Sequence, residues 1–364
     1  MKNIHRKTLF LSGVVLLSCM KIFPQDPNFY IYLCFGQSNM CGAGSIEAQD
    51  KTVDSRYQMM EPIGCTNRNQ TFGKWYPAVP PLWGCNGGLG PTDYFGRTMV
   101  QNLPATIKVG VIVVAVPGCD ILLFDKKGYK GYDTYNTVPA KYNGSAYAWL
   151  MELAKLAQKD GVIKGFLLHQ GETMPDASKW PGQVKGVYDS LIADLQLVPS
   201  KTPLLAGEML YADKGGCCES HNSTIAKLPA VIPNSYVISA QGLPGKDQYH
   251  FTTEGNRTLG KRYAEKMLTL IDPVASRDDQ KPDRYGTSGG GKIRAAAVTR
   301  DAVRITLDGG FSYKIITLYG TLIEGGNGRG ALTAGANLAP GTYFLLVKHT
   351  TGFFTERIIK SDCF

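Results

Sequence analysis

A serine, a histidine and an acidic residue occur in patterns that suit acyl transfer. The segment GQSNM at residues 36–40 carries Ser38 at the end of an apolar run. The segment DQYH at residues 247–250 places Asp247 three residues before His250. A histidine oriented by a carboxylate can take the proton of a serine hydroxyl, which then attacks an ester carbonyl. We therefore predict Ser38 as nucleophile, His250 as its base and Asp247 as the partner of His250.

Donors for an oxyanion are found at three positions. Gly118 follows a second apolar run, and Gln170 belongs to the segment HQGE at residues 169–172 after a third. Backbone N–H groups and side-chain amides aimed at one point stabilise the negative charge of a tetrahedral intermediate. We predict that the backbone N–H groups of Ser38 and Gly118 and the side chain of Gln170 form the oxyanion hole. The alternative for Gly118 is an ordinary turn glycine.

A second carboxylate is also a candidate for the catalytic group. Glu172 ends the HQGE segment, and it could orient His250 together with Asp247 or in its place. The sequence leaves that choice open. It also leaves open that His169 or Glu172 only satisfies buried backbone groups.

These candidates must be positioned by a sheet, because each follows an apolar run that predicts a strand. Strand-like and helical patterns alternate from residue 29 to about 272, which predicts a parallel sheet covered by helices on both faces. In such sheets ligands bind at the carboxyl ends of the strands. The predicted strands are 29–35, 107–116, 162–168, 203–207 and 236–239, and the predicted helices are 93–102, 145–159, 184–195 and 253–270.

Three segments in this order resemble the motifs of the SGNH-hydrolase superfamily: GQSNM at 36–40, HQGE at 169–172 and DQYHF at 247–251. More narrowly, they resemble carbohydrate esterase family 6 and the related sialate O-acetylesterase-like domain. The resemblance spans residues 29 to about 270. It implies a three-layer α/β/α fold with a five-stranded parallel sheet, and removal of acetyl groups from sugars without a metal or an organic cofactor. The chain departs from the family pattern after Gly118, where Cys119 stands in place of a small Thr or Ser.

The expected substrate is an acetylated polysaccharide, with acetylated xylan as the first choice. One alternative keeps the chemistry and changes the substrate to O-acetylated sialic acid on host glycans. The other is a carbohydrate-binding protein that has a hydrolase fold but no activity. An intact set of Ser38, Asp247 and His250 favours an enzyme.

The first residues have the pattern of an export signal. Lys2, Arg6 and Lys7 precede a short apolar stretch at residues 9–17, which is typical of a signal peptide. We predict a signal peptide over residues 1–25, and thus a secreted or cell-surface protein with its esterase domain at 26–272. An alternative is a lipoprotein in which Cys19 carries the lipid.

The chain changes in composition after residue 272. Residues 273–291 are polar and rich in Gly and Pro, and they predict a linker. Residues 292–364 contain strand-like runs and predict a small β-sandwich. This segment resembles the C-terminal sorting domain of type IX secretion, which implies contact with secretion machinery. The alternative is a carbohydrate-binding module.

Cysteines and charges limit other functions. Eight cysteines remain without Cys19, and we predict that Cys65 and Cys85 pair in a Gly- and Pro-rich loop. Cys217 and Cys218 with a nearby histidine have poor spacing for a metal site. Lys and Arg exceed Asp and Glu by nine but form no run of five or more, so we expect no nucleic-acid partner.

Overall fold

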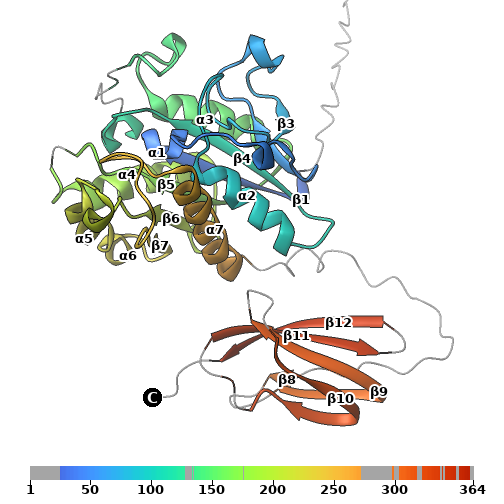
Figure 1. Ribbon diagram of the computed structural model, residues 1–364. Helices are drawn as coiled ribbons and strands as arrows, with labels where there is room; N and C mark the ends of the chain where they lie inside the picture. The colour runs from blue at the N-terminus through green and yellow to red at the C-terminus, as the bar shows by residue number, and fades with distance from the viewer. Residues whose placement is uncertain are drawn as a thin grey trace, which may run out of the picture. The chain divides into compact units, whose positions relative to one another are not determined.

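The computed structural model describes most of the chain between residues 25 and 360. The described residues are 25–127, 133, 135–174, 176–271, 297–298, 303–317, 322–336, 338, 341–349 and 352–360. The chain divides into two compact units, Met1–Ser276 and Arg277–Phe364. Figure 1 shows helices around a sheet in the first unit and strands alone in the second. Residues 1–24 of the predicted signal peptide, which include Cys19, and the predicted linker lie outside the described residues.

A sheet of seven strands forms the centre of the first unit. Its order is β3-β2-β4-β1-β5-β6-β7, and all neighbours are parallel except β2 and β3. The predicted α/β fold is therefore confirmed, and the five predicted strands are β1, β4, β5, β6 and β7. The strands span Asp26–Gly36 (β1), Tyr57–Met60 (β2), Trp75–Pro77 (β3), Lys108–Ala115 (β4), Gly161–His169 (β5), Leu204–Gly207 (β6) and Ser235–Ile238 (β7).

The number of strands implied by the family resemblance, five, is wrong. β2 and β3 extend the sheet beyond β4 at one edge. Each has only three or four residues and lies in a segment rich in Gly and Pro. Strands this short carry too little alternation to be recognised from sequence.

Helices cover both faces of this sheet, as β1 illustrates. Phe35 and the alternate residues before it join one apolar cluster with α3 and α4, whereas Tyr32 and the residues two positions away from it join a second cluster with α2 and α7. Successive side chains of a strand point to opposite faces, so a continuous apolar run indicates a strand buried on both sides. The helices span Pro91–Asn102 (α2), Ala146–Ala157 (α3), Trp180–Asp194 (α4) and Thr253–Leu270 (α7).

The long segment between β1 and α2 is anchored to the core. Cys65 and Cys85 form a disulfide, which confirms the predicted pair. Trp75 donates a hydrogen bond from Nε1 to Asp160 (2.9 Å) and packs its ring edge-on against Phe29. Trp75 therefore holds the loop in place.

The second unit is one antiparallel sheet with its own small core. The strands pair in the order β10-β9-β11-β12, and β8 pairs with β9. Tyr313, Ile315, Leu345 and Val347 are among the buried side chains. The bounds are Ala297–Val298 (β8), Val303–Thr317 (β9), Leu322–Ala334 (β10), Gly341–His349 (β11) and Gly352–Lys360 (β12).

Two details of this unit differ from the sequence prediction. The described strands hydrogen-bond into one sheet, not into the two that a sandwich requires, and the long strand β9 pairs with β8, β10 and β11. Strand β10 was not predicted, since four of its thirteen residues are glycine, which is uncommon in strands.

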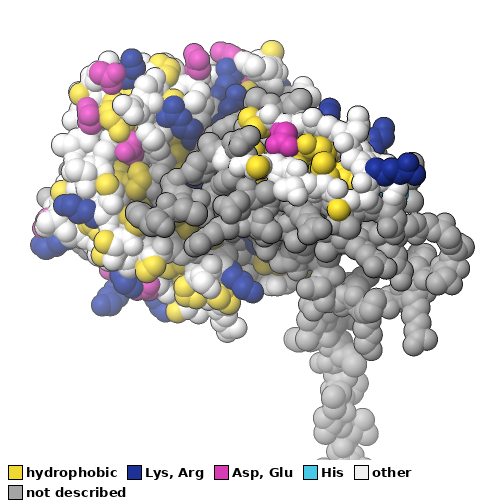
Figure 2. Space-filling model, turned by 90° about the horizontal axis from the view of Figure 1, so that it is seen from below, with side chains coloured by type: hydrophobic (Ala, Val, Ile, Leu, Met, Phe, Trp, Pro, Cys, Tyr) yellow, Lys and Arg dark blue, Asp and Glu magenta, His cyan; other side chains and the backbone are white. Residues whose placement is uncertain are grey.

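Charged side chains are mixed on the face that Figure 2 shows. Among its described residues, Lys and Arg stand singly or in small groups between neutral and acidic side chains. No described helix has both the length and the apolar character needed to cross a membrane.

Candidate active site

A sharp turn after β1 presents Ser38. Ser38 is the first residue of the short helix α1 (Ser38–Cys41), two residues after the strand end at Gly36. Gly36 has φ +144°, and a Cβ there would lie 2.1 Å from the carbonyl oxygen of His169 on β5. Gln37 donates its backbone N–H to the same oxygen (3.0 Å). Only glycine allows β1 and β5 to approach this closely at the turn.

Ser38, His250 and Asp247 lie in one hydrogen-bonded line. Nε2 of His250 is 2.9 Å from the Ser38 hydroxyl oxygen, and Nδ1 is 2.9 and 3.0 Å from the two Asp247 oxygens. A carboxylate at Nδ1 keeps the proton on that nitrogen and leaves Nε2 as the acceptor for the serine proton. The three predicted residues are thus brought together by loops 212 residues apart in sequence.

The Asp247 carboxylate is held in its ionised form. Partial burial acts to raise its pKa, but hydrogen bonds from the His250 ring and from the backbone N–H groups of Tyr249 and His250 outweigh burial, so the pKa lies below its ordinary value. Both backbone bonds are 2.8 Å long. Asp247 can therefore stabilise a positive charge on His250.

Asp247, and not Glu172, is the hydrogen-bond partner of Nδ1 of His250. Glu172 instead accepts a 2.6 Å hydrogen bond at Oε1 from the side chain of Asn39. The same Asn39 amide donates to the carbonyl of Tyr249 (2.9 Å), and its oxygen accepts the N–H of Phe251 (3.4 Å). Glu172 and Asn39 therefore hold the residues on both sides of His250.

Burial sets the ionisation of two groups beneath the site. The side chain of Glu172 is 4% exposed, and burial raises its pKa to about 7, against a smaller opposing effect of the Asn39 hydrogen bond. His169 is fully buried, and burial lowers its pKa to about 3. His169 is thus neutral near pH 7, and its Nε2 lies 4.0 Å from Glu172 Oε1. His169 packs edge-on against Phe251.

Two backbone N–H groups beside the serine have no partner among the described residues. They belong to Ser38, at the start of α1, and to Gly118, which follows β4 with φ +69°. The N–H groups of a first helical turn have no acceptor within the helix. Since β4 and β1 are adjacent in the sheet, these two groups come from neighbouring strand ends.

Gln170 is placed at the site, but its amide is engaged with the protein. Its Nε2 lies within hydrogen-bond distance of the Gln37 side chain (3.1 Å) and of the carbonyls of Cys119 (3.2 Å) and Thr173 (2.6 Å). Its Oε1 accepts from the Trp180 indole (2.5 Å). In this arrangement Gln170 braces the strand ends, and donation from Gln170 to an oxyanion stays a prediction.

Gln37 and Asn39 were not predicted as functional residues. Oε1 of Gln37 accepts bonds from Gln170, from the backbone of Gly171 and, at 3.4 Å, from that of Thr173. Its Nε2 donates to no described residue. The sequence does place an amide side chain on each side of Ser38. Amide residues are common in turns, however, so this pattern alone does not indicate a functional role.

Two adjacent cysteines near the site are joined to each other. Cys217 and Cys218 form a disulfide, so they do not supply the thiolates that a metal site with His221 would need. The described residues contain no group of three or more His, Cys, Asp or Glu side chains suited to a metal ion.

The chain is similar to one known protein family and to several solved structures. The family model described as carbohydrate esterase, sialic acid-specific acetylesterase matches residues 28–269. A structure from Arabidopsis thaliana is similar over 67% of this chain and 99% of its own, at 22% identity and a TM-score of 0.52. A carbohydrate acetylesterase from Xanthomonas citri is similar over 87% of this chain and 74% of its own, at 14% identity and a TM-score of 0.47. A family two carbohydrate esterase from Clostridium thermocellum is similar over 68% of this chain and 66% of its own, at 10% identity and a TM-score of 0.39.

Proposed function

Because the chain belongs to the sialic acid-specific acetylesterase family of carbohydrate esterases, we propose that it is a secreted serine esterase that removes O-acetyl groups from polysaccharide. The observation that carries the proposal is the continuous line from the Ser38 hydroxyl through His250 to Asp247. Acetylated xylan is the proposed substrate.

The proposed reaction has two steps. His250 takes the proton of Ser38 as the serine oxygen attacks the acetyl carbonyl, and the sugar hydroxyl leaves with that proton. Water activated by His250 then attacks the acetyl-serine, acetate leaves, and Ser38 regains its proton. The developing oxyanion in both steps is stabilised by the N–H groups of Ser38 and Gly118.

A second substrate class follows from the family description, which names sialic acid. An O-acetylated sialic acid offers the same ester to Ser38, and the same line of residues would cleave it. The two substrates differ in the sugar that surrounds the ester, which carries a carboxylate only in sialic acid.

Location is also part of the proposal. The basic and apolar pattern of residues 1–25 supports export, and the separate β-unit supports contact with a secretion machinery of the type IX kind. An enzyme that acts on polysaccharide outside the cell needs such a route.

The test measures acetate release from acetylated xylan, O-acetylated sialic acid and 4-nitrophenyl acetate. We expect wild type to release acetate from xylan, and Ser38→Ala and His250→Ala to lose about a hundredfold or more in kcat/KM on every substrate it cleaves. Ser200→Ala is the control, because Ser200 is exposed at the opposite end of β6.

Cleavage of sialic acid esters without cleavage of xylan would move the assignment to the second substrate. A folded wild-type protein that cleaves none of the three would contradict the esterase and favour a carbohydrate-binding role.

A further inference from the structure

A pocket of about 590 Å³ lies in the loop that follows β6. This volume falls within the range of about 300–1,000 Å³ in which small ligands bind. The lining contains no residue of the Ser38–His250–Asp247 line, so the pocket is separate from the acyl-transfer centre. Its lining residues are Tyr211, Ala212, Gly216, Cys217, Glu219, Ser220, Asn222 and Ser223.

The pocket loop contacts the segment that carries His250. β6 lies between β5 and β7 in the sheet, so its loop leaves the carboxyl edge between the loops that carry Gln170 and His250. Cys217 donates its backbone N–H to the carbonyl of Gln248, two residues before His250 (3.0 Å). A substrate longer than one sugar that places an ester at Ser38 has this loop beside it.

The loop is held by its own hydrogen bonds. Glu219 accepts the backbone N–H of Ala212 (2.7 Å), and Tyr211 donates its hydroxyl to Glu208 (2.9 Å). Asn222 exchanges two hydrogen bonds with the backbone of Met209. A pocket formed in advance loses little conformational freedom when a ligand binds.

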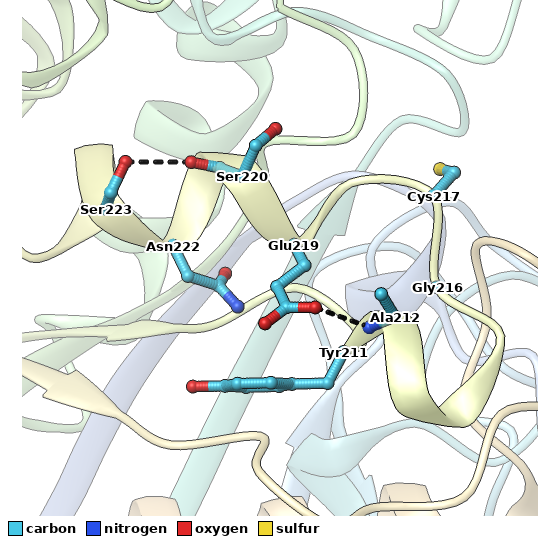
Figure 3. A pocket seen from close by; sticks show the side chains of 8 residues that line it. All are labelled: Tyr211, Ala212, Gly216, Cys217, Glu219, Ser220, Asn222 and Ser223. Atoms are coloured by element: carbon cyan, nitrogen blue, oxygen red, sulfur yellow. Dashed lines mark hydrogen bonds between the residues drawn. The ribbon is translucent and has the colours of Figure 1, made fainter.

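The lining combines flat apolar surface with polar groups. In Figure 3 the carboxylate of Glu219 and the amide of Asn222 point toward the ring of Tyr211, and Cys217 lies at the far end beyond Gly216. Cys217 is exposed and carries the disulfide to its neighbour. Of the two Glu219 carboxylate oxygens, only Oε2 accepts a hydrogen bond from another described residue.

We infer that this pocket binds a sugar unit of the polysaccharide next to the one that carries the acetyl group. Sugars present an apolar C–H face and an edge of hydroxyl groups, and the lining offers an aromatic ring at Tyr211 and a carboxylate at Glu219 for these two kinds of contact. The inference rests on the proposed function for the identity of the polymer. The pocket would therefore increase the affinity for a polysaccharide chain. A small ester such as 4-nitrophenyl acetate is too short to occupy it while its acetyl group is at Ser38.

The inference is tested by a substitution that places a large side chain in the pocket. Ala212 is exposed, and Ala212→Trp keeps the backbone N–H that Glu219 accepts while adding an indole to the lining. We expect about a fivefold or larger rise in KM for acetylated xylan, with kcat/KM for 4-nitrophenyl acetate within about twofold of wild type. Glu219→Gln, which keeps an acceptor and removes the charge, should raise KM for the polymer in the same way.

The matched control is Ala193→Trp. Ala193 is also exposed, but it lies near the end of α4. Equal effects of Ala212→Trp and Ala193→Trp on xylan, or no effect of either, would overturn the inference. So would an equal loss on 4-nitrophenyl acetate by Ala212→Trp, because that ester does not need the pocket.

A binding measurement separates this inference from the proposed function. Unacetylated xylohexaose is titrated into wild type and both tryptophan variants by calorimetry. If wild type releases no acetate from any of the three esters but binds xylohexaose, and Ala212→Trp alone weakens that binding about fivefold or more, the pocket stands and the esterase proposal fails. Absence of binding to wild type overturns the pocket as a sugar site whatever the activity.

Discussion

Two carboxylates near His250 differ in environment and therefore in what they can do. Asp247 is partly exposed, and its hydrogen bonds keep its pKa below the ordinary value, so it stays ionised against the imidazole. Glu172 is buried, and one of its oxygens has no hydrogen-bond partner. Its pKa near 7 means that it changes charge within the working pH range of many enzymes.

This difference predicts a pH effect on stability. Glu172 ionises near 4.5 in the unfolded chain and near 7 in the folded one, so the folded state binds the extra proton between these values. Stability from the neutral carboxyl is fully present below about pH 4.5 and is lost as the pH rises through about 7. Glu172→Gln cannot lose a proton, so its thermal midpoint relative to wild type should rise between pH 5 and pH 8.

Thermal unfolding of wild type, Glu172→Gln and the control Glu254→Gln over this pH range checks the effect. Glu254 is exposed at the start of α7, so its replacement should give a difference that does not change in this direction. If the difference in thermal midpoint between Glu172→Gln and wild type stayed constant over this pH range, the pKa of Glu172 would be the same in the folded and the unfolded protein, which would contradict the prediction.

The choice between Asp247 and Glu172 shows which features of single residues can be predicted from the sequence and which cannot. Serine, histidine and aspartate were predictable, because their types and order suit one chemistry. Which carboxylate meets Nδ1 depends on where the loops after β5 and β7 lie in space. Spacing along the chain does not contain that information, and for the same reason the bonds that engage the Gln170 amide were not foreseen.

At the scale of elements, the central strands and long helices were predictable. β1, β4 and β5 are buried on both faces and read as continuous apolar runs. α7 begins after Thr252, whose side chain caps the helix by accepting the backbone N–H of Gly255. Short or Gly-rich strands such as β3 and β10 were missed, because tertiary pairing rather than local sequence stabilises them.

The junction of β1 and α1 gives a prediction at this scale. Gly36→Ala would place a methyl group against the carbonyl oxygen of His169 on the neighbouring strand, in a backbone conformation unfavourable for alanine. We expect a loss of about 2 kcal/mol or more in the free energy of unfolding, measured with urea, together with reduced activity.

The control for that change is Gly182→Ala on α4. Gly182 is exposed, and nothing lies within 4 Å of the added Cβ. Because alanine favours a helix over glycine, this variant should gain about 0.5–1 kcal/mol. If Gly36→Ala proved as stable as Gly182→Ala, the close approach of β1 and β5 would be wrong.

At the scale of the whole molecule, the two units have separate apolar cores. Among the side chains that the structure describes, those buried in the second unit form a cluster of their own. The family match ends at residue 269, within the first unit. The first unit therefore contains every residue assigned to the proposed chemistry.

We predict that a chain ending at Ser276 folds and keeps its activity. Its kcat/KM on 4-nitrophenyl acetate should lie within about twofold of the full chain, because every residue assigned to the proposed chemistry lies in the first unit. A folded truncated chain with activity reduced tenfold or more would show that the second unit contributes to catalysis.

The central claim is that Ser38 is a nucleophile activated by His250. The most direct test treats the full chain with diisopropyl fluorophosphate and locates the label by peptide mass spectrometry. We predict one modified residue, Ser38, and labelling slowed by about a hundredfold or more in folded His250→Ala. A label on another serine, or an unchanged rate without His250, would contradict the account.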